Sequence, residues 1–376
     1  MKKRGSEEKE DNVMEQKDLK QRTKDVAMTD SAFVLVVDDS SFMRKSLTHI
    51  LESDESLAVV GTAADGKEAI RKVKQFHPDV VLMDIEMPVM DGLAALAHIM
   101  AECPTPVLML SALNKRDRAI AIKSLEHGAV DFIQKPSGVI SYDIDKLSNE
   151  IATKVKIAAG VNVHKIKLSL PTETFLRHWQ EPGTGEKMVV IGASTGGPRA
   201  VEKILSGLPR DISTAIIVAQ HMTQDFVPSF VERLQWACSV KISIAEEDEV
   251  ICSGRVLVAP GNCHTRIVQN GGSKKIRFSW NTPSHAVSPS IDYVMESAAK
   301  VYGAGAIGVL LTGIGSDGAL GLKAIKDAGG STIAEDQSSC LIFGMPKAAI
   351  DLGCVDEIVP LPLIAQTILR TISNVE

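Results

Sequence analysis

Short apolar segments alternate with amphipathic helical segments through most of this chain, and this alternation limits its fold more than any other feature. Five such units follow one another, at residues 33–52, 57–76, 79–100, 106–129 and 130–155. From Met188 onward strand-like and helix-like segments alternate again. Apolar strands that alternate with helices predict parallel sheets covered by helices on both faces. We therefore expect two α/β units, the first built on a five-stranded parallel sheet and the second on a mostly parallel, doubly wound sheet.

Changes in composition indicate where the domains begin and end. Residues 1–30 are nearly all polar, so they cannot bury enough apolar surface to offset the entropy of ordering, and we expect a disordered tail. The periodicity fades again between 160 and 187, where prolines and glycines interrupt it. The sequence thus predicts a first domain at 31–159, a linker at 160–187 and a second domain at 188–376.

The composition argues against several classes of protein. The net charge of −6 over 376 residues argues against nucleic acid as the main partner, because phosphate backbones need a basic face. No apolar run approaches the roughly 18 residues that cross a bilayer, and the N-terminus lacks the apolar core of a secretory signal. The six cysteines form no C-x-x-C pair, which is typical of reduced core residues in a cytoplasmic protein.

Polar side chains end the predicted strands of the first domain. Asp38 and Asp39 end the first strand, Asp84 the third, Ser111 the fourth and Lys135 the fifth. Functional groups of parallel sheets gather beyond the carboxyl ends of the strands. Three carboxylates at one site repel one another unless a hard cation such as Mg²⁺ lies among them, and a carboxylate is a competent phosphoryl acceptor. The alternative is that each residue is a helix cap or a strand-end ion pair.

The segments VVDDS, MDIEMPVMDG and DFIQKP, with the Ser111-Ala112 step, resemble the receiver domains of two-component response regulators. The resemblance implies a flavodoxin-like fold and a phosphoryl group transferred from a histidine kinase to Asp84. It implies Mg²⁺ held by Asp39, Asp84 and the backbone carbonyl of Glu86, with Asp38 nearby. It also implies that the phosphoryl group is sensed by Ser111, Lys135 and the switch aromatic Phe132.

The segment 188–200, MVVIGASTGGPRA, predicts a buried strand that turns sharply into a helix, with Ser194 at the turn. Glycines permit so tight a turn, and Pro198 suits the first turn of a helix. The residues from Gly192 to Gly196 match the G-x-S-x-G pattern of a serine nucleophile held between a strand and a helix. Such turns also bind phosphate, or only connect a strand to a helix.

Two later strand ends offer partners for this serine. His221 comes at the end of the apolar segment STAIIVAQHM, and Asp317 comes at the end of the segment AGAIGVLLTGIGSD. Serine hydrolysis needs a nucleophile, an imidazole that takes its proton and a carboxylate that orients the imidazole. We assign no catalytic role to the further histidine, His264. The chain order serine, histidine, aspartate differs from that of the α/β-hydrolases, so the motif does not predict that fold.

Residues 313–318 form a G-x-G-x-x-G sequence between a strand and a helix, followed by Glu335 and Asp336 at the distance of a ribose-binding acid. A dinucleotide site is therefore an alternative. Asp317 argues against it, because its carboxylate lies in the loop that would have to hold a pyrophosphate. This alternative also leaves Ser194 and His221 without a role.

The second domain resembles the catalytic domain of the chemotaxis-receptor methylesterases, the CheB family. The matching segments are IGASTGGPRA, QHM, VLVAPGNCHTRI, PSID, LTGIGSDGA, AED and IFGMPKAAI. The resemblance implies that Ser194 is the nucleophile, His221 the general base and acid, and Asp317 the orienting acid. Two departures could alter receptor choice or rate: Ile314 replaces a usual methionine, and Val287-Ser288 replaces a usual His-Arg pair.

The resemblance implies a phosphorylation-activated serine esterase without a cofactor for the esterase reaction. Its substrates would be glutamate γ-methyl esters and specific glutamines of methyl-accepting chemotaxis receptors, and its phosphodonor a chemotaxis histidine kinase. It would act in the cytoplasm at receptor arrays, with no insertion into the membrane. A phosphorylation-controlled adaptor with an inactive esterase domain is the alternative from another class, and the intact set of Ser194, His221 and Asp317 argues against it.

Overall fold

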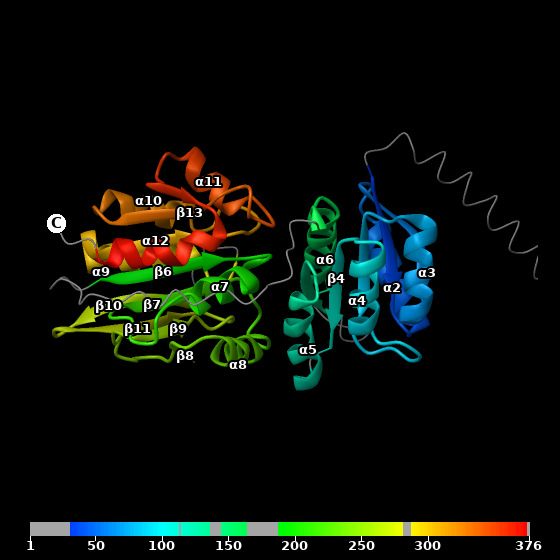
Figure 1. Ribbon diagram of the computed structural model, residues 1–376, viewed down its shortest axis with the longest axis horizontal. Helices are drawn as coiled ribbons and strands as arrows, with labels where there is room; N and C mark the ends of the chain where they lie inside the picture. Colours follow the sequence, from blue (N-terminus) through cyan, green and yellow to red (C-terminus); the bar gives the residue numbers. More distant parts are fainter. Residues whose placement is uncertain (1–30, 113, 136–143, 164–186, 281–286, 374–376) are drawn as a thin grey trace, which may run out of the picture.

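The computed structural model describes most of the chain, namely residues 31–112, 114–135, 144–163, 187–280 and 287–373. These residues form two α/β domains that lie side by side (Figure 1). The predicted tail and most of the predicted linker lie outside the described residues, so the domain limits stay predictions.

The first domain has the predicted five-stranded parallel sheet, with the strand order β2-β1-β3-β4-β5. Its elements are β1 (Ala32–Val37), α2 (Ser41–Glu52), β2 (Leu57–Ala63), α3 (Gly66–Phe76), β3 (Val80–Asp84), α4 (Gly92–Glu102), β4 (Val107–Ser111), α5 (Lys115–Glu126), β5 (Asp131–Gln134) and α6 (Ile144–Ala159). Four of its helices begin after a side chain that accepts a first-turn N–H, which satisfies an otherwise unpaired donor: Ser40, Asp65, Asp91 and Asn114.

Alternate residues of its strands face opposite layers of helices. Val34 and Val36 of β1 belong to the apolar cluster formed with α2 and α6. Leu35 and Val37 belong to the cluster formed with α3, α4 and α5. Successive side chains of a strand point to opposite faces, so a strand covered on both sides is apolar throughout.

The second domain has a seven-stranded parallel sheet in the order β14-β13-β12-β6-β7-β9-β8, and β10 and β11 form a separate antiparallel pair. Its strands are β6 (Met188–Ala193), β7 (Ala215–Gln220), β8 (Lys241–Ile244), β9 (Arg255–Val258), β10 (His264–Asn270), β11 (Ser273–Ser279), β12 (Ala306–Leu310), β13 (Ser331–Glu335) and β14 (Glu357–Val359). Its helices are α7 (Gly197–Ser206), α8 (Val227–Ala237), α9 (Ile291–Tyr302), η2 (Gly303–Gly305), α10 (Ala319–Asp327), α11 (Met345–Asp351) and α12 (Leu361–Ser373).

The order of the strands fixes where a site can form in this domain. The chain runs outward from the central strand β6 through β7 to one edge, and then crosses back to β12 and builds the other edge. The direction of winding therefore reverses between β6 and β12. In open α/β sheets, ligands bind beyond the carboxyl ends of the strands at such a reversal.

The two domains contact each other through helices and apolar side chains. Helix α5 of the first domain packs against α7 and α8 of the second. The ring centroid of Phe132 on β5 lies 4.5 Å from that of Phe226, the residue immediately before α8. Arg233 of α8 forms ion pairs with Glu126 of the first domain and with Glu202 of its own.

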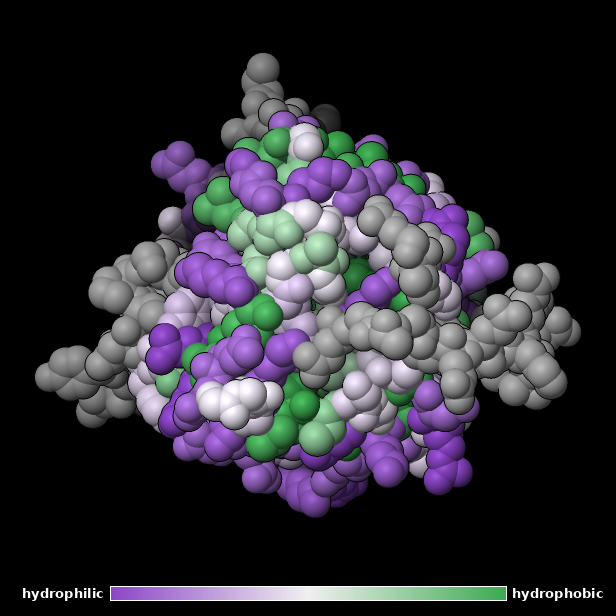
Figure 2. Space-filling view, turned by 90° about the vertical axis from the view of Figure 1, so that its left-hand side faces the viewer, coloured by the Kyte–Doolittle hydropathy of each residue, from purple (hydrophilic) through white to green (hydrophobic). Residues whose placement is uncertain are grey.

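Among the described residues, no helix is long and apolar enough to span a bilayer. Figure 2 shows the end of the second domain that lies away from the first, where hydrophobic residues are distributed among hydrophilic ones in separate patches.

Candidate functional site

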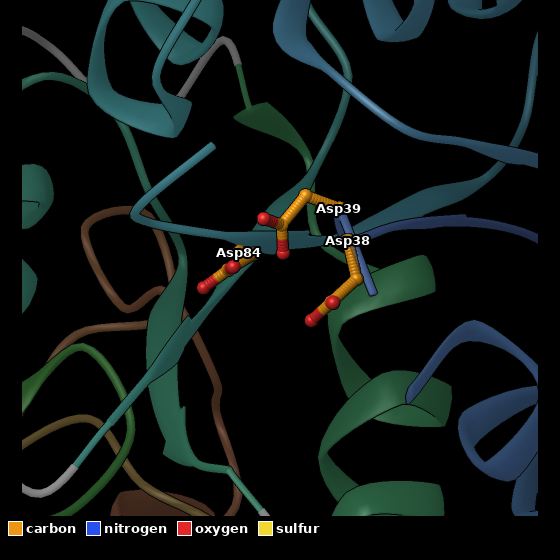
Figure 3. A group of neighbouring side chains, drawn as sticks. All are labelled: Asp38, Asp39 and Asp84. Atoms are coloured by element: carbon orange, nitrogen blue, oxygen red, sulfur yellow. The ribbon is translucent and has the colours of Figure 1, made fainter. Parts of the chain in front are cut away.

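Three carboxylates gather at the carboxyl edge of the first sheet. Asp38 and Asp39 follow β1 and Asp84 ends β3, and one oxygen of each lies within 4.8 Å of the others (Figure 3). Asp38 and Asp84 are buried, whereas Asp39 is exposed. Carboxylate oxygens at this spacing are the ligands that Mg²⁺ prefers, so the residues present fit the cation expected from the sequence.

Lys135 reaches into this cluster from the end of β5. Its Nζ lies 2.8 Å from Asp38 Oδ2 and 2.6 Å from Asp84 Oδ2. Burial and the charge of Asp38 together raise the pKa of Asp84 to about 6, although Lys135 and the N–H of Ile85 lower it. One ammonium group therefore does not compensate the charge of the buried carboxylates, which again favours a cation at this position.

The other residues expected to act with Asp84 lie on β4, on β5 and in the loop after β3. Ser111 ends β4, is fully buried, and donates its hydroxyl to the carbonyl of Ala112 at 3.1 Å. Glu86 lies in the loop after β3, and its exposed carboxylate pairs with Arg116 at 3.5 Å. Phe132 is buried against the second domain. The structure thus brings Asp38, Asp39, Asp84 and Lys135 together, and makes Phe132 an interdomain contact.

The predicted turn at Ser194 is held by backbone and side-chain contacts from both neighbouring strands. The N–H of Ser194 donates to the carbonyl of Thr312 after β12, at 3.0 Å. The Nε2 of Gln220, at the end of β7, donates to the carbonyl of Ser194 at 2.9 Å. Gly196 has a φ of 78°, and a Cβ on Gly313 would lie 2.6 Å from the Cβ of Ser194. Only glycine suits either position.

His221 and Asp317 meet next to this turn. His221 Nε2 lies 2.8 Å from Asp317 Oδ2, and both side chains are largely buried. Burial alone would raise the pKa of Asp317, but the hydrogen bonds from His221 and from the N–H groups of Ile291 and Asp292 lower it to about 2. Asp317 is therefore a permanent anion that orients the imidazole ring.

The three sequence-predicted residues follow three adjacent strands, since β12, β6 and β7 are neighbours in the sheet. Because Nε2 of His221 is bonded to Asp317, Nδ1 is the ring nitrogen left to take a proton. Among the hydrogen bonds of the described residues, none joins the Ser194 hydroxyl to the imidazole. His264 accepts the N–H of Ser290 at its Nδ1, 3.2 Å away, so it supports the residue before α9.

The loop 313–318 is occupied by contacts within the protein. Asp317 is bonded to His221 and to the start of α9, and the N–H of Gly318 donates to Asp292 Oδ1 at 2.8 Å. A dinucleotide phosphate at this loop would have to displace these bonds, which argues further against the dinucleotide alternative.

Sequence reasoning missed two residues of the site. Gln220, 3% exposed, donates its amide both to Ser194 and to the carbonyl of His221 at 3.0 Å. Asp292 bonds the start of α10. The sequence does offer a signal for Asp292: it lies two residues after Ser290, a typical N-cap residue, and therefore in the first turn of a predicted helix. A glutamine that ends a strand carries no comparable signal.

The first domain also contacts the residue next to Ser194. The hydroxyl of Thr195 donates to Asp131 Oδ2 of β5 at 3.1 Å, and Lys154 Nζ lies 3.1 Å from the same oxygen. Leu341 and Ile342, which lie near this turn, pack against the apolar cluster of the first domain. The turn is therefore partly covered by the first domain.

Comparisons with known proteins confirm both family resemblances. Residues 189–368 match the CheB methylesterase family, and residues 34–142 match the response regulator receiver domain. A Pyrococcus abyssi protein named protein-glutamate methylesterase/protein-glutamine glutaminase is 44% identical over 347 residues, which cover 91% of this chain and 94% of that protein. A Halalkalibacterium halodurans protein of the same name is 41% identical over 338 residues, 90% of this chain and 97% of that protein. The crystal structure of the Thermotoga maritima CheB methylesterase catalytic domain is 35% identical with a TM-score of 0.49, and the match covers 50% of this chain and 99% of that one.

Proposed function

Since the chain belongs to the family of protein-glutamate methylesterases/protein-glutamine glutaminases, we propose that it is a serine esterase controlled by phosphorylation. Its substrates are glutamate γ-methyl esters and specific glutamines on methyl-accepting chemotaxis receptors, so that it mediates chemotactic adaptation. The observation that carries the proposal is the bond between His221 and Asp317 beside the Ser194 turn. It acts in the cytoplasm at receptor arrays, where these substrates lie.

Ser194 is the nucleophile of the proposed reaction. Its hydroxyl oxygen attacks the ester carbonyl carbon while Nδ1 of His221 takes the proton, and the imidazolium is stabilised by Asp317. When the tetrahedral intermediate collapses, the proton passes from His221 to the leaving methoxide, and methanol departs. Water then attacks the acyl-enzyme with His221 as the base, which regenerates Ser194 and leaves a glutamate side chain. A glutamine amide follows the same steps with ammonia as the leaving group.

Two backbone N–H groups are available for the oxyanion of this intermediate. Two other N–H groups of the turn already have acceptors within the protein: that of Ser194 donates to the carbonyl of Thr312, and that of Gly197 donates to the carbonyl of Ser194. By contrast, the N–H groups of Thr195 and Gly196 have no acceptor among the described residues. Donors positioned in advance at the developing charge are usually the largest electrostatic contribution to such a reaction. We assign the oxyanion to Thr195 and Gly196.

The first domain is the phosphorylation switch of this proposal. An oxygen of Asp84 attacks the phosphorus atom of the kinase's phosphohistidine, the phosphorus–nitrogen bond breaks, and the kinase histidine leaves. Lys135 and Ser111 hold the oxygens of the transferred phosphoryl group. Asp39, Asp84 and the backbone carbonyl of Glu86, with Asp38 nearby, would hold Mg²⁺, which would offset the negative charge at this edge.

The domain contacts support control of Ser194 by Asp84. Phe132 and Asp131 both lie on β5, the strand that is followed by Lys135 of the Asp84 cluster. The ring of Phe132 contacts that of Phe226, and Asp131 accepts the hydroxyl of Thr195. A shift of β5 after phosphorylation therefore changes contacts at the Ser194 turn directly. The two packings need differ by only a few kcal/mol for phosphorylation to exchange them.

Methanol release by the full chain tests the proposed function. Receptor membranes that carry radiolabelled methyl esters are incubated with the protein, with and without a small phosphodonor and Mg²⁺. We expect release that the phosphodonor stimulates, no release by Ser194→Ala, and normal release by Ser273→Ala, which removes a serine of the β10–β11 hairpin. Asp84→Asn should keep the basal rate and lose the stimulation. Equal methanol release by Ser194→Ala and wild type would overturn the assignment of Ser194 as the nucleophile. If the wild type releases no methanol, the result would favour the adaptor alternative.

A further inference from the structure

Helices α9 and α10 each hold a carboxylate that comes from the other's N-terminal segment. Asp317, in the loop before α10, accepts the N–H of Ile291 at 2.7 Å and that of Asp292 at 3.1 Å, both in the first turn of α9. Asp292 in turn accepts the N–H of Gly318 at 2.8 Å and that of Gly321 at 2.6 Å, at the start of α10. A carboxylate is stabilised at a helix N-terminus by unpaired N–H groups. The exchange therefore fixes the two helix starts against each other.

Two glycines make this close approach possible. Gly318 has a φ of 93°, and a Cβ there would lie 2.4 Å from Leu310 Cδ1. A Cβ on Gly321 would lie 2.6 Å from Met295 Cβ of α9. Both positions therefore lack room for a side chain, and the start of α10 lies directly on α9. This brings the Gly318 and Gly321 N–H groups within reach of Asp292, which is 8% exposed.

The two aspartates differ in acidity as a result. Burial and the nearby charge of Asp317 together raise the pKa of Asp292 to about 6, although the N–H groups of Gly321 and Gly318 oppose this. Asp317 has its pKa lowered to about 2 by His221 and the start of α9, against the effect of burial. Asp292 thus acts as an acceptor of backbone N–H groups beside a permanent anion.

We propose that Asp292 is a positioning residue for the Asp317–His221 pair. Its two hydrogen bonds hold the Gly318 turn, and this turn carries Asp317 at the distance and angle that keep Oδ2 on His221. Asp292 does not contact the substrate, so it acts only through Asp317. The inference rests on the proposed function and assigns a role to the PSID segment, which none of the three catalytic residues explains.

Removal of the acceptor has a definite consequence. In Asp292→Ala the N–H groups of Gly318 and Gly321 are buried without a partner, and the turn moves to find one. A displacement of about 1 Å at catalytic groups costs about 10²-fold in rate. Asp292→Asn keeps an amide oxygen at the same place, so it preserves both hydrogen bonds. The rate should therefore fall in the variant that lacks a hydrogen-bond acceptor at position 292 and not in the variant that keeps one.

The test measures kcat and KM for methanol release by the phosphodonor-treated full chain at pH 7.5. We expect Asp292→Ala to lower kcat about 10- to 100-fold with KM within about twofold of wild type, and Asp292→Asn to recover most of that loss. The matched control is Asp356→Ala. It removes a carboxylate of the same domain that accepts the N–H of Thr332 at 2.9 Å, at the start of β13 and away from the site. It should leave kcat unchanged.

A spectroscopic measurement separates positioning from folding and from the substrate assignment. In histidine-labelled protein, the low-field proton resonance of His221 Nε2–H reports its bond to Asp317. We expect this resonance in wild type, in Asp292→Asn and in Asp356→Ala, and its loss in Asp292→Ala, at unchanged far-ultraviolet circular dichroism. An unchanged resonance or kcat in folded Asp292→Ala would overturn the inference, as would loss of the resonance in Asp292→Asn. If the wild type releases no methanol, the proposed function fails, and the resonance alone decides the inference.

Discussion

Two carboxylates at the carboxyl edges of the two sheets have opposite acidities. Burial raises the pKa of Asp84 to about 6. The pKa of Asp317 is lowered to about 2 although burial opposes this. The side chain of Asp84 is 4% exposed, and that of Asp317 is 17% exposed. Both aspartates are therefore shielded from water, and burial alone does not explain the sign of the difference.

The hydrogen-bond donors around each carboxylate explain it. Asp84 accepts the N–H of the next residue, Ile85, at 2.7 Å, and it shares Lys135 with Asp38. Asp317 accepts two N–H groups and the Ser290 hydroxyl at the start of α9, as well as His221. Asp84 is thus suited to take a phosphoryl group when a cation compensates its charge. Asp317 is suited to remain an anion throughout a reaction.

The largest effect should come from removing the permanent anion. Asp317→Asn keeps the shape of the side chain but leaves His221 without a charged partner, and an amide N–H₂ turned toward the imidazole favours the wrong tautomer. We expect kcat for methanol release to fall by about 10²- to 10⁴-fold with little change in KM. Asp327→Asn, on the exposed face of α10 where Asp327 pairs with Lys323, is the control and should retain full activity. Activity within tenfold of wild type would show that the two carboxylates do not differ as described.

The next effect concerns stability and its dependence on pH. Because the folded-state pKa of Asp84, about 6, lies above the value of about 3.9 in an unfolded chain, the native state binds more protons between pH 4 and 6. The contribution of Asp84 to stability therefore falls as the pH rises through this window, by up to about 3 kcal/mol. Asp84→Asn should stabilise the first domain by about 1–3 kcal/mol at pH 7.5 and by nothing at pH 4.

Hydrogen exchange of peptides from β1, β3 and β4 measures this difference in stability for the first domain alone. Millimolar Mg²⁺ should slow exchange in wild type and have no effect on Asp84→Asn. For Asp317 we expect stability to change with pH in the opposite direction. Its lowered pKa gives a contribution to stability that is present above pH 4 and is lost as the pH falls through about 2. An Asp84→Asn variant less stable than wild type at pH 7.5 would refute the assignment of uncompensated charge to Asp84.

The smallest effect concerns backbone strain near the two sites. In the second domain the turn residues with positive φ near the site are glycines, namely Gly196, Gly315 and Gly318. The loop after β3 instead has Val89 at a φ of 68°, where a β-branched residue is strained. Val89→Asn should stabilise the first domain by about 1 kcal/mol, measured by the same exchange experiment. Val250→Asn, an exposed valine outside this region of φ, should not stabilise the protein.

Local sequence information predicted both sheets and most of the site residues. A short apolar segment before a capped amphipathic segment indicates a parallel strand and its helix, and the residue that ends the strand then lies at the functional edge. Asp38, Asp84, Lys135, Ser194 and His221 were all placed in this way. Each of these inferences depends on neighbours within about ten residues, which is why the sequence alone supports them.

The relations between these segments were decided by the tertiary structure. Strand order places β12 and β7 on either side of β6, so His221 meets Asp317 across 96 residues of sequence. The exchange of carboxylates between α9 and α10, and the bond from Thr195 to Asp131, likewise join segments that only packing brings together. The periodicity of a segment shows which face it buries. It does not show which partner covers that face, because any apolar surface of matching shape satisfies the same hydrophobic requirement.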